Sequence, residues 1–149
     1  MHITNRMKAA LGVTDKPGRV FIGGGPLRYS MSPEGYKLIV EVDPEITRFA
    51  RALIPKHFYP QPTRYAAHIT VVRKETPSCL EAWGAFEGRE VAFSYNSEVD
   101  HDDVHFWLCC WSPFLLAARE GLGLPLMTPL TRPPSGEDCF HSTVATARR

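Results

Sequence analysis

Two short segments of the sequence carry the same residue types at the same spacing: His68-Ile69-Thr70-Val71 and His141-Ser142-Thr143-Val144. Each lies in a run rich in β-branched residues, which favours a β-strand. Because residues i and i+2 of a strand point to the same face, each segment should present one imidazole and one hydroxyl side by side. Two such strands brought together would supply a general acid, a general base and hydroxyl donors. These groups can cleave a phosphodiester without a metal ion.

A third His-x-Thr, His2-Ile3-Thr4, stands at the N-terminus. It is followed by the polar Asn5, no strand-like run surrounds it, and chain termini are usually poorly ordered. We interpret it as a chance match. The two internal copies agree in strand context and in the valine that follows, so we predict that their histidines and threonines form one catalytic site.

Length and composition fit one compact enzyme domain over residues 1–149. Apolar residues make up 44% and charged residues 22% of the sequence, which are ordinary values for a globular protein. The net charge of +1 argues against long nucleic acid as a partner, because proteins that bind long nucleic acid usually have strongly basic surfaces. A small anionic substrate is compatible with it.

Cysteine usage and hydropathy predict a cytoplasmic protein without a membrane segment. The four cysteines show no disulfide spacing, and Cys109 and Cys110 stand together in an apolar run. The first twelve residues carry charges and no long apolar stretch, so no signal peptide is expected. The longest apolar run, residues 106–118, is shorter than the roughly 20 residues that span a bilayer.

The first histidine segment follows a strand and a helix. Residues 36–42 read as a strand, and Asp43 and Pro44 are favourable as the N-cap and first turn of a helix. Apolar residues then recur at helical spacing to about Lys56: Ile46, Phe49, Ala50, Leu53 and Ile54. After a proline-containing loop, residues 65–73 should form the first histidine strand.

The second histidine segment follows the same order of elements. Residues 90–99 and 104–111 read as strands joined by a turn. Ser112-Pro113 then begins a helix that ends at Gly121. A proline-rich loop leads into the second histidine strand, over residues 139 to about 147.

The other segments carry weaker signals. Residues 5–11 and 78–86 are expected to form short helices, and residues 19–22 a brief strand. The run Gly23-Gly24-Gly25-Pro26 invites a phosphate-loop interpretation, but no Gly-Lys-Ser/Thr follows it, and Pro26 disfavours a helix there. We predict a flexible loop.

The chain therefore reads as two lobes of similar plan, about residues 35–75 and about residues 90–147. With one His-x-Thr motif in each lobe, at His68 and at His141, the arrangement resembles the 2H phosphoesterase superfamily. That resemblance implies an α+β fold in which antiparallel sheets surround a central cleft and helices flank them.

Three segments narrow the resemblance: residues 65–75 (YAAHITVVRKE), 83–88 (WGAFEG) and 131–141 (TRPPSGEDCFH). They are similar to a phage branch of the superfamily that degrades the cyclic oligonucleotide messengers of bacterial anti-phage immunity, the CBASS systems. The resemblance covers about residues 36–148. It implies a cyclic di- or trinucleotide substrate, no cofactor and, for a phage protein, the cytoplasm of the bacterial host.

The mechanism that the resemblance implies is acid–base transfer at phosphorus. One histidine, neutral, takes a proton from the nucleophile, and the other, protonated, donates one to the leaving oxygen. Thr70 and Thr143 would donate hydrogen bonds to the non-bridging oxygens. The nucleophile would be the ribose 2′-hydroxyl for a 3′–5′ linkage and water for a cyclic phosphate. The sequence does not assign the acid and the base between His68 and His141.

Four further residues are predicted to bind the substrate. Tyr36 and Trp107 lie on expected strands and could stack on nucleobases, with a place in the core as the alternative. Lys74 shares strand parity with the motif histidine and could reach a phosphate, whereas Arg73 should point to the opposite face. Arg132, in the loop before the second motif, could also contact the substrate.

A metal site is not expected from the sequence. The segment His101-Asp102-Asp103-Val104-His105 mixes imidazoles and carboxylates, but Asp and His gather in turns for backbone reasons. Cys139 with His141 suggests zinc, yet a second Cys/His pair at suitable spacing is missing.

Two alternative functions stay open, and the sequence does not indicate the oligomeric state. An RNA 2′,3′-cyclic or 2′–5′ phosphodiesterase would use the same groups, although the near-neutral charge weakly disfavours long RNA. A non-catalytic sponge that binds cyclic nucleotides would use the same cleft. Binding alone does not require two proton-transfer groups, so the paired motifs favour an enzyme.

Overall fold

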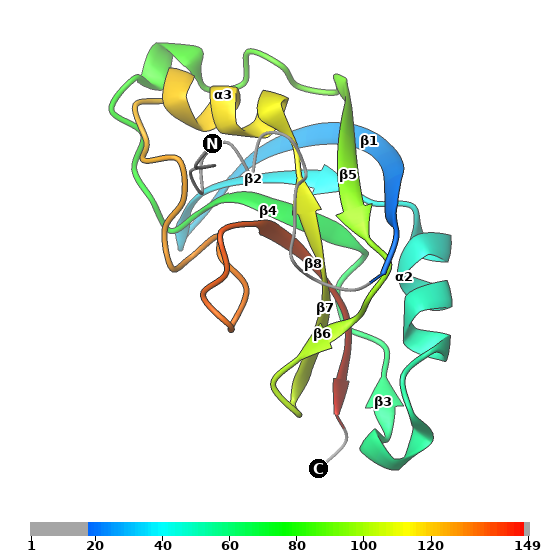
Figure 1. Ribbon diagram of the computed structural model, residues 1–149. Coiled ribbons are helices and arrows are strands. Elements are labelled where there is room, and N and C mark those ends of the chain that lie inside the picture. Colours follow the sequence, from blue (N-terminus) through cyan, green and yellow to red (C-terminus); the bar gives the residue numbers. More distant parts are fainter. Residues whose placement is uncertain (1–17, 148–149) are drawn as a thin grey trace, which may run out of the picture.

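The computed structural model describes residues 18–147 as an α+β structure built on one antiparallel sheet (Figure 1). Its strands are β1 (Val20–Ser32), β2 (Gly35–Glu41), β3 (Pro60–Gln61), β4 (His68–Arg73), β5 (Glu90–Asn96), β6 (Asp100–His101), β7 (His105–Trp111) and β8 (Phe140–Ala147). Its helices are α2 (Pro44–Ala52) and α3 (Pro113–Gly121), with single 3-10 turns at Lys56–Phe58 and Leu80–Ala82. The helix expected over residues 5–11 and the motif-like His2-Ile3-Thr4 lie outside the described residues.

The two halves of the sheet repeat the same order of elements. The strands follow the order β3-β8-β7-β5-β1-β2-β4, and β6 pairs with β7. From the central pair of β1 and β5, the chain runs outward through β2 and β4 on one side and through β7 and β8 on the other. Each half carries one helix, α2 or α3, between its outer two strands along the chain.

Both helices begin where the sequence predicts. The Asp43 carboxylate accepts a hydrogen bond from the backbone of Glu45 (2.9 Å), and the Ser112 hydroxyl accepts one from Leu115 (3.3 Å). Each cap satisfies a backbone N–H that has no partner within the helix, and a proline occupies the first turn of each helix.

The expected apolar stripe of α2 is only partly buried, and the helix ends at Ala52 rather than near Lys56. Ala50 and Ile54 are buried, but Phe49 and Leu53 are 70% and 60% exposed. The contact with the sheet is therefore narrower than the stripe of apolar residues.

Each helix packs against the histidine strand of the other half of the sheet. Helix α2 contacts β8, and its Ala50 is buried in a small core with Leu108 and Val144. Helix α3 contacts β4, and its Leu115 belongs to the larger core, which also holds Ile69 and Val71. The two halves consequently build their cores from each other's residues.

The glycine run lies inside a long strand, which corrects the prediction of a flexible loop. Strand β1 pairs with β5 through its first seven residues and with β2 through its last six. A Cβ on Gly25 would stand 1.7 Å from the carbonyl oxygen of Glu41, and one on Gly23 would stand 2.8 Å from the Phe93 ring. The glycines therefore permit close packing where β1 changes partner.

Smaller differences concern the short elements. The helix expected over residues 78–86 is reduced to the 3-10 turn at Leu80–Ala82, and the turn between β5 and β7 contains the short strand β6. Among residues 18–147, no helix is long and apolar enough to cross a membrane.

Candidate functional site

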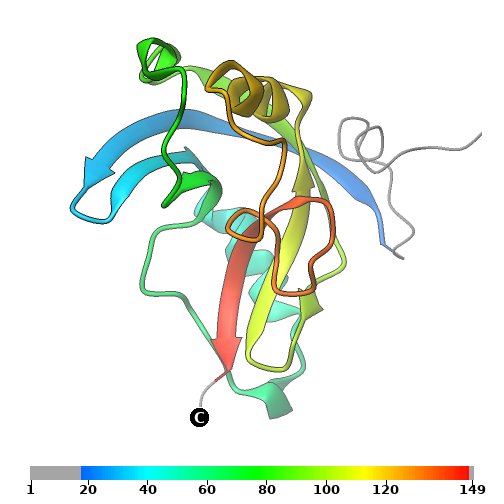
Figure 2. The same cartoon turned by 90° about the vertical axis from the view of Figure 1, so that its left-hand side faces the viewer.

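The two histidine strands come together in space although they lie far apart in the hydrogen-bonded order of the sheet. Strands β4 and β8 contact each other, and Figure 2 shows them next to each other in green and red. On both strands the motif histidine and threonine are partly exposed, while the residue between them is buried. The predicted sharing of a face within each motif is confirmed: His68 with Thr70, and His141 with Thr143.

Both motif strands contain a β-bulge at the same motif position. Ile39 and Leu38 of β2 are opposite Thr70 and Val72, so Val71 is the extra residue on β4. On β8 the extra residue is Val144, since Trp107 and Phe106 of β7 are opposite Thr143 and Ala145. A bulge re-aims the side chains beside it. Here each bulge directly follows the motif threonine.

An arginine from the opposite half binds the carbonyl of each bulge valine. Arg51 of α2 donates to the carbonyl oxygen of Val144 (3.0 Å), and Arg119 of α3 donates to that of Val71 (2.7 Å). Arg119 is fully buried and also forms a bidentate ion pair with Glu75, at 2.9 and 2.7 Å. Each helix therefore fixes the bulge next to the other half's histidine and threonine.

The two imidazoles are oriented in the same way. His68 Nδ1 lies 2.8 Å from the carbonyl oxygen of Ala66, and His141 Nδ1 lies 3.1 Å from that of Thr131. A carbonyl oxygen only accepts, so Nδ1 of each ring carries the hydrogen. In the neutral tautomer this leaves Nε2 of each ring as the basic nitrogen, and in the protonated form Nε2 is a proton donor.

The environment of His141 favours its neutral form. Burial lowers the pKa of His141 most, the hydrogen bond to Thr131 opposes that shift, and the nearby charges of His68 and His105 lower the pKa further. The contact between β4 and β8 is what brings His68 near enough to influence His141.

The loop before β8 is held in place by a series of hydrogen bonds. Thr131 is fully buried, and its backbone N–H and hydroxyl both donate to the carbonyl of Thr128 (3.0 and 3.1 Å). Arg119 donates to the carbonyls of Pro125 and Leu126 at the start of the loop (2.8 and 3.0 Å). The acceptor for His141 is thereby positioned by α3 as well as by its own loop.

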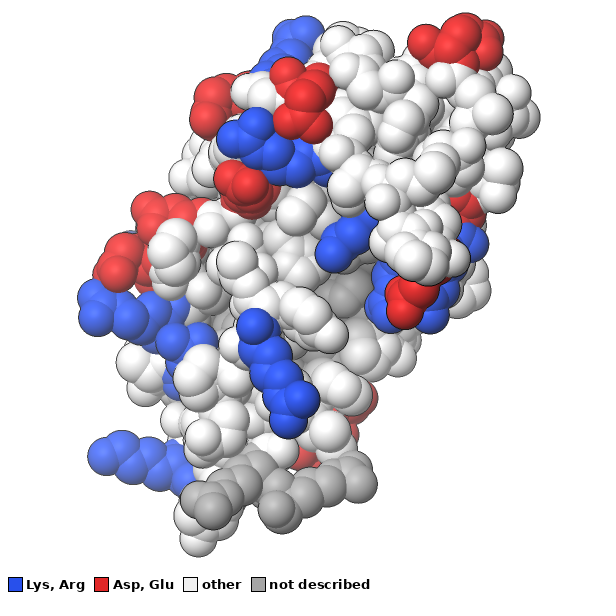
Figure 3. Space-filling view, turned by 180° about the vertical axis from the view of Figure 1, so that it is seen from behind, with Lys and Arg blue, Asp and Glu red and all other residues white. Residues whose placement is uncertain are grey.

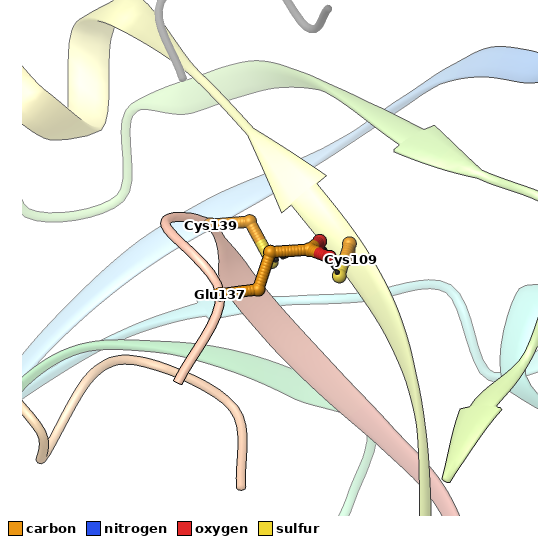
Figure 4. Close-up of side chains that lie close together, drawn as sticks. All are labelled: Cys109, Glu137 and Cys139. Carbon is orange, nitrogen blue, oxygen red and sulfur yellow. Dashed lines mark hydrogen bonds between the residues drawn. The ribbon is translucent and has the colours of Figure 1, made fainter. Parts of the chain in front are cut away.

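Three potential metal ligands lie beside His141: Cys109, Glu137 and Cys139 (Figure 4). Their ligand atoms lie within 4.8 Å of one another, and both thiols donate to one oxygen of Glu137, at 2.9 and 3.5 Å. Burial raises the pKa of Cys139, which keeps its thiol protonated as a donor. Zinc sites use four ligands, of which this group offers three. In its protonated form the cluster ties the loop to β7.

The segment at residues 101–105, which mixes imidazoles and carboxylates, forms the turn that its composition favours. Asp102 accepts hydrogen bonds from the backbone of Val104 (3.0 Å) and His105 (2.7 Å). His101 lies 3.1 Å from Asp103. The carboxylate of Asp102 thus has the role of a turn-forming side chain.

Neither aromatic candidate for base stacking presents a free ring face beside the histidines, although Trp107 is directly opposite Thr143. Trp107 is 1% exposed within the larger core, so neither of its ring faces can stack on a ligand in this structure. Tyr36 lies on the same face of β2 as Leu38 and Val40, which are fully buried, and its ring contacts Trp83 edge to face. Both follow the alternative interpretation, in which strand aromatics serve the core.

The bulge at Val71 reverses the predicted face of Arg73, and Lys74 lies beyond the end of the strand. Beyond the bulge, Arg73 is opposite Lys37, which shares a face of β2 with Ile39, the partner of Thr70. Arg73 therefore points to the side of Thr70, contrary to prediction. Lys74 follows the end of β4 in a left-handed backbone conformation (φ 54°) and no longer shares the parity of His68.

Arg132 has an ion-pair partner of its own. Its Nε donates to Asp138 at 2.9 Å across the loop before β8, and both side chains are about one-third exposed. A substrate phosphate would have to compete with this carboxylate.

Charged residues are dispersed on the side of the molecule shown in Figure 3. Among the described residues visible there, Lys and Arg alternate with Asp and Glu and with uncharged surface. This distribution agrees with the net charge of +1.

No protein-family model matches the chain, and no curated protein or solved structure matches it either.

The sequence alone did not identify the groups that orient the two motif histidines and fix the bulges beside them. The carbonyls of Ala66 and Thr131 have no sequence signal, because every residue carries a carbonyl. The bulges have a weak one: Val71-Val72 and Val144-Ala145 are pairs of adjacent apolar residues that interrupt strand alternation. Arg51 is visible in the sequence only as a charged residue near the end of an amphipathic helix.

Proposed function

We propose that this protein is a phosphodiesterase that hydrolyses cyclic di- or trinucleotide signals by acid–base catalysis with His68 and His141, without a metal ion. The observation that carries the proposal is the pair of equivalent motifs on contacting strands, with Nδ1 of each histidine bound to a backbone carbonyl. Two imidazoles prepared to exchange protons through Nε2 are what such a reaction needs.

In this proposal His141 is the general base. The lowered pKa of His141 favours its neutral form near pH 7. Its Nε2 can then take the proton of the nucleophile as the new P–O bond forms. The nucleophile is first the ribose 2′-hydroxyl, which leaves a 2′,3′-cyclic phosphate, and then water, which opens that cyclic phosphate. His68, protonated, then gives its Nε2 proton to the oxygen that leaves phosphorus. Thr70 and Thr143 donate hydrogen bonds to the non-bridging oxygens as negative charge builds there. The protons exchange through solvent before the next turnover.

The substrate class follows from the resemblance to the phage branch of the 2H phosphoesterase superfamily. In that interpretation, the two halves of the sheet are the two lobes of the fold, with one His-x-Thr motif from each. The phage context would make the protein an antagonist of CBASS immunity, and its substrate would be the cyclic messenger.

The test is product analysis in EDTA with two substrates: 3′3′-cyclic GMP–AMP and an RNA oligonucleotide that ends in a 2′,3′-cyclic phosphate. We expect opening of the cyclic dinucleotide, and a loss of about 10²–10⁴-fold in rate in both His68→Ala and His141→Ala. His57→Ala, which removes an exposed histidine elsewhere, is the matched control.

The other outcomes assign a different function. Action on the RNA end alone would identify an RNA 2′,3′-cyclic or 2′–5′ phosphodiesterase. Tight binding of the cyclic dinucleotide without turnover would identify a sponge. Activity that disappears in EDTA and returns with added zinc would contradict the metal-free mechanism and direct attention to Cys109, Glu137 and Cys139.

A further inference from the structure

A row of three exposed polar side chains crosses the half of the sheet that carries His68. Ser30 of β1 is opposite Lys37 of β2, and Lys37 is opposite Arg73 of β4. Directly opposed residues in antiparallel strands point to the same face, so the hydroxyl, the ammonium and the guanidinium stand side by side. All three residues are exposed.

This row lies on the same face as the first motif. The neighbouring row on that face contains Thr70, opposite Ile39, and the row beyond it contains His68, opposite Glu41. Two residues along a strand span about 7 Å, so the cationic row is about 7 Å from the Thr70 row and about 13 Å from the His68 row. The bulge at Val71 is what turns Arg73 to this face.

Within residues 18–147, the charges of Lys37 and Arg73 are not compensated by an ion pair. Like charges directly opposite each other destabilise a sheet. Neither side chain has an ion-pair partner among residues 18–147, whereas Arg28, in the adjacent row, is paired with both Glu41 and Glu87 at 3.2 Å. An anion bound between Lys37 and Arg73 would relieve this repulsion.

We propose that Lys37 and Arg73, with Ser30 beside them, bind a second phosphodiester of the substrate while the scissile one lies at the histidines. This proposal rests on the proposed function and specifies its substrate: an oligonucleotide with at least two phosphodiesters, rather than a 2′,3′-cyclic mononucleotide. The Arg73 guanidinium can bind two phosphate oxygens at once, and Lys37 adds a point charge. Because these residues act on binding, they should affect KM more than kcat.

The experiment compares Lys37→Gln and Arg73→Gln on two substrates, 3′3′-cyclic GMP–AMP with two phosphodiesters and 2′,3′-cyclic AMP with one. We expect each variant to raise KM for the cyclic dinucleotide about tenfold, as for the loss of one charge-assisted contact, and KM for the mononucleotide by a clearly smaller factor. Arg48→Gln, which removes an exposed cation on α2, is the matched control and should shift neither KM.

Equal changes on both substrates would overturn the proposal, since they would mean a general effect on Thr70 or on the sheet. Turnover of the mononucleotide alone would overturn it as well. If the wild-type protein turns over neither substrate, the proposed catalysis fails and calorimetric binding of 3′3′-cyclic GMP–AMP decides the subsite. Binding that weakens about tenfold in the two variants supports it; equal affinity, or no binding by the wild-type protein, overturns it.

Discussion

At the scale of single residues, the two motif histidines have the same orientation but different surroundings. Each Nδ1 lies against a backbone carbonyl, which fixes the tautomer that leaves Nε2 free for proton transfer. The residue that provides the acceptor for His141, Thr131, is itself fully buried, and burial of His141 disfavours its charged form. In the proposed mechanism, this asymmetry is the reason for taking His141 as the base and His68 as the acid.

We predict that His141 titrates below the ordinary histidine value of about 6.5. Its neutral form is lost as the pH falls through that lowered pKa, so the acid limb of kcat/KM should lie below pH 6.5. The unfolded chain binds the same proton more readily, so His141 also makes the fold less stable as the pH falls below about 6.5. NMR titration of the imidazole signals measures the pKa directly, with His141→Gln to assign the resonance. A pKa above 6.5 would reverse the assignment of base and acid.

At the scale of elements, the motif strands are shaped by helices that come from the opposite half. The bulges at Val71 and Val144 break strand alternation just after each motif threonine, and Arg119 and Arg51 bind their carbonyls. The two contacts differ in burial. Arg119 is fully enclosed with Glu75, whereas Arg51 remains partly exposed.

Arg119→Met should therefore destabilise the protein far more than Arg51→Met. Removing Arg119 leaves Glu75 without its partner in a largely buried place, which costs about 3–5 kcal/mol of unfolding free energy. Removing Arg51 loses one hydrogen bond that water can partly replace, about 0.5–1.5 kcal/mol. Urea unfolding measures both, and Arg48→Met on the exposed side of α2 is the control. Equal losses for Arg119 and Arg51 would show that burial of the ion pair does not decide its contribution.

At the scale of the whole molecule, the two halves are interlocked. Helix α2 covers β8, helix α3 covers β4, and the central strands β1 and β5 pair along seven residues. The helix that covers each histidine strand comes from the other half of the chain. A separated half would therefore lack the helix that covers its histidine strand. The candidate site can consequently form only when both halves of the sheet are present.

We predict that the fragments 1–76 and 77–149 are unfolded when separate and fold when mixed. Each fragment alone would expose the apolar residues that the other half buries, such as Ile69 and Val144. Circular dichroism of each fragment and of the equimolar mixture measures this, with the intact chain as reference. Cooperative unfolding of fragment 1–76 on its own would show instead that the halves are independent.

The local elements of this fold are encoded where the sequence has local causes. The caps at Asp43-Pro44 and Ser112-Pro113 are formed by residues next to the backbone groups that they satisfy, so both helix starts were predictable. The two histidine strands were predictable from β-branched residues, and the shared face of each His and Thr from the period of two. The long β1 was not predictable in this way, because pairing with β5 and β2 decides its extent.

The sequence by itself determined the residues that could exchange protons, the elements that carry them and the face that each pair shares. Only the tertiary structure decided what surrounds them: the burial of Trp107, the side of the sheet that Arg73 occupies, and the carbonyls that orient His68 and His141. The physical reason is that these features depend on partners distant in the chain. A bulge exists only against a neighbouring strand, and a strand aromatic is buried or exposed according to what packs over it.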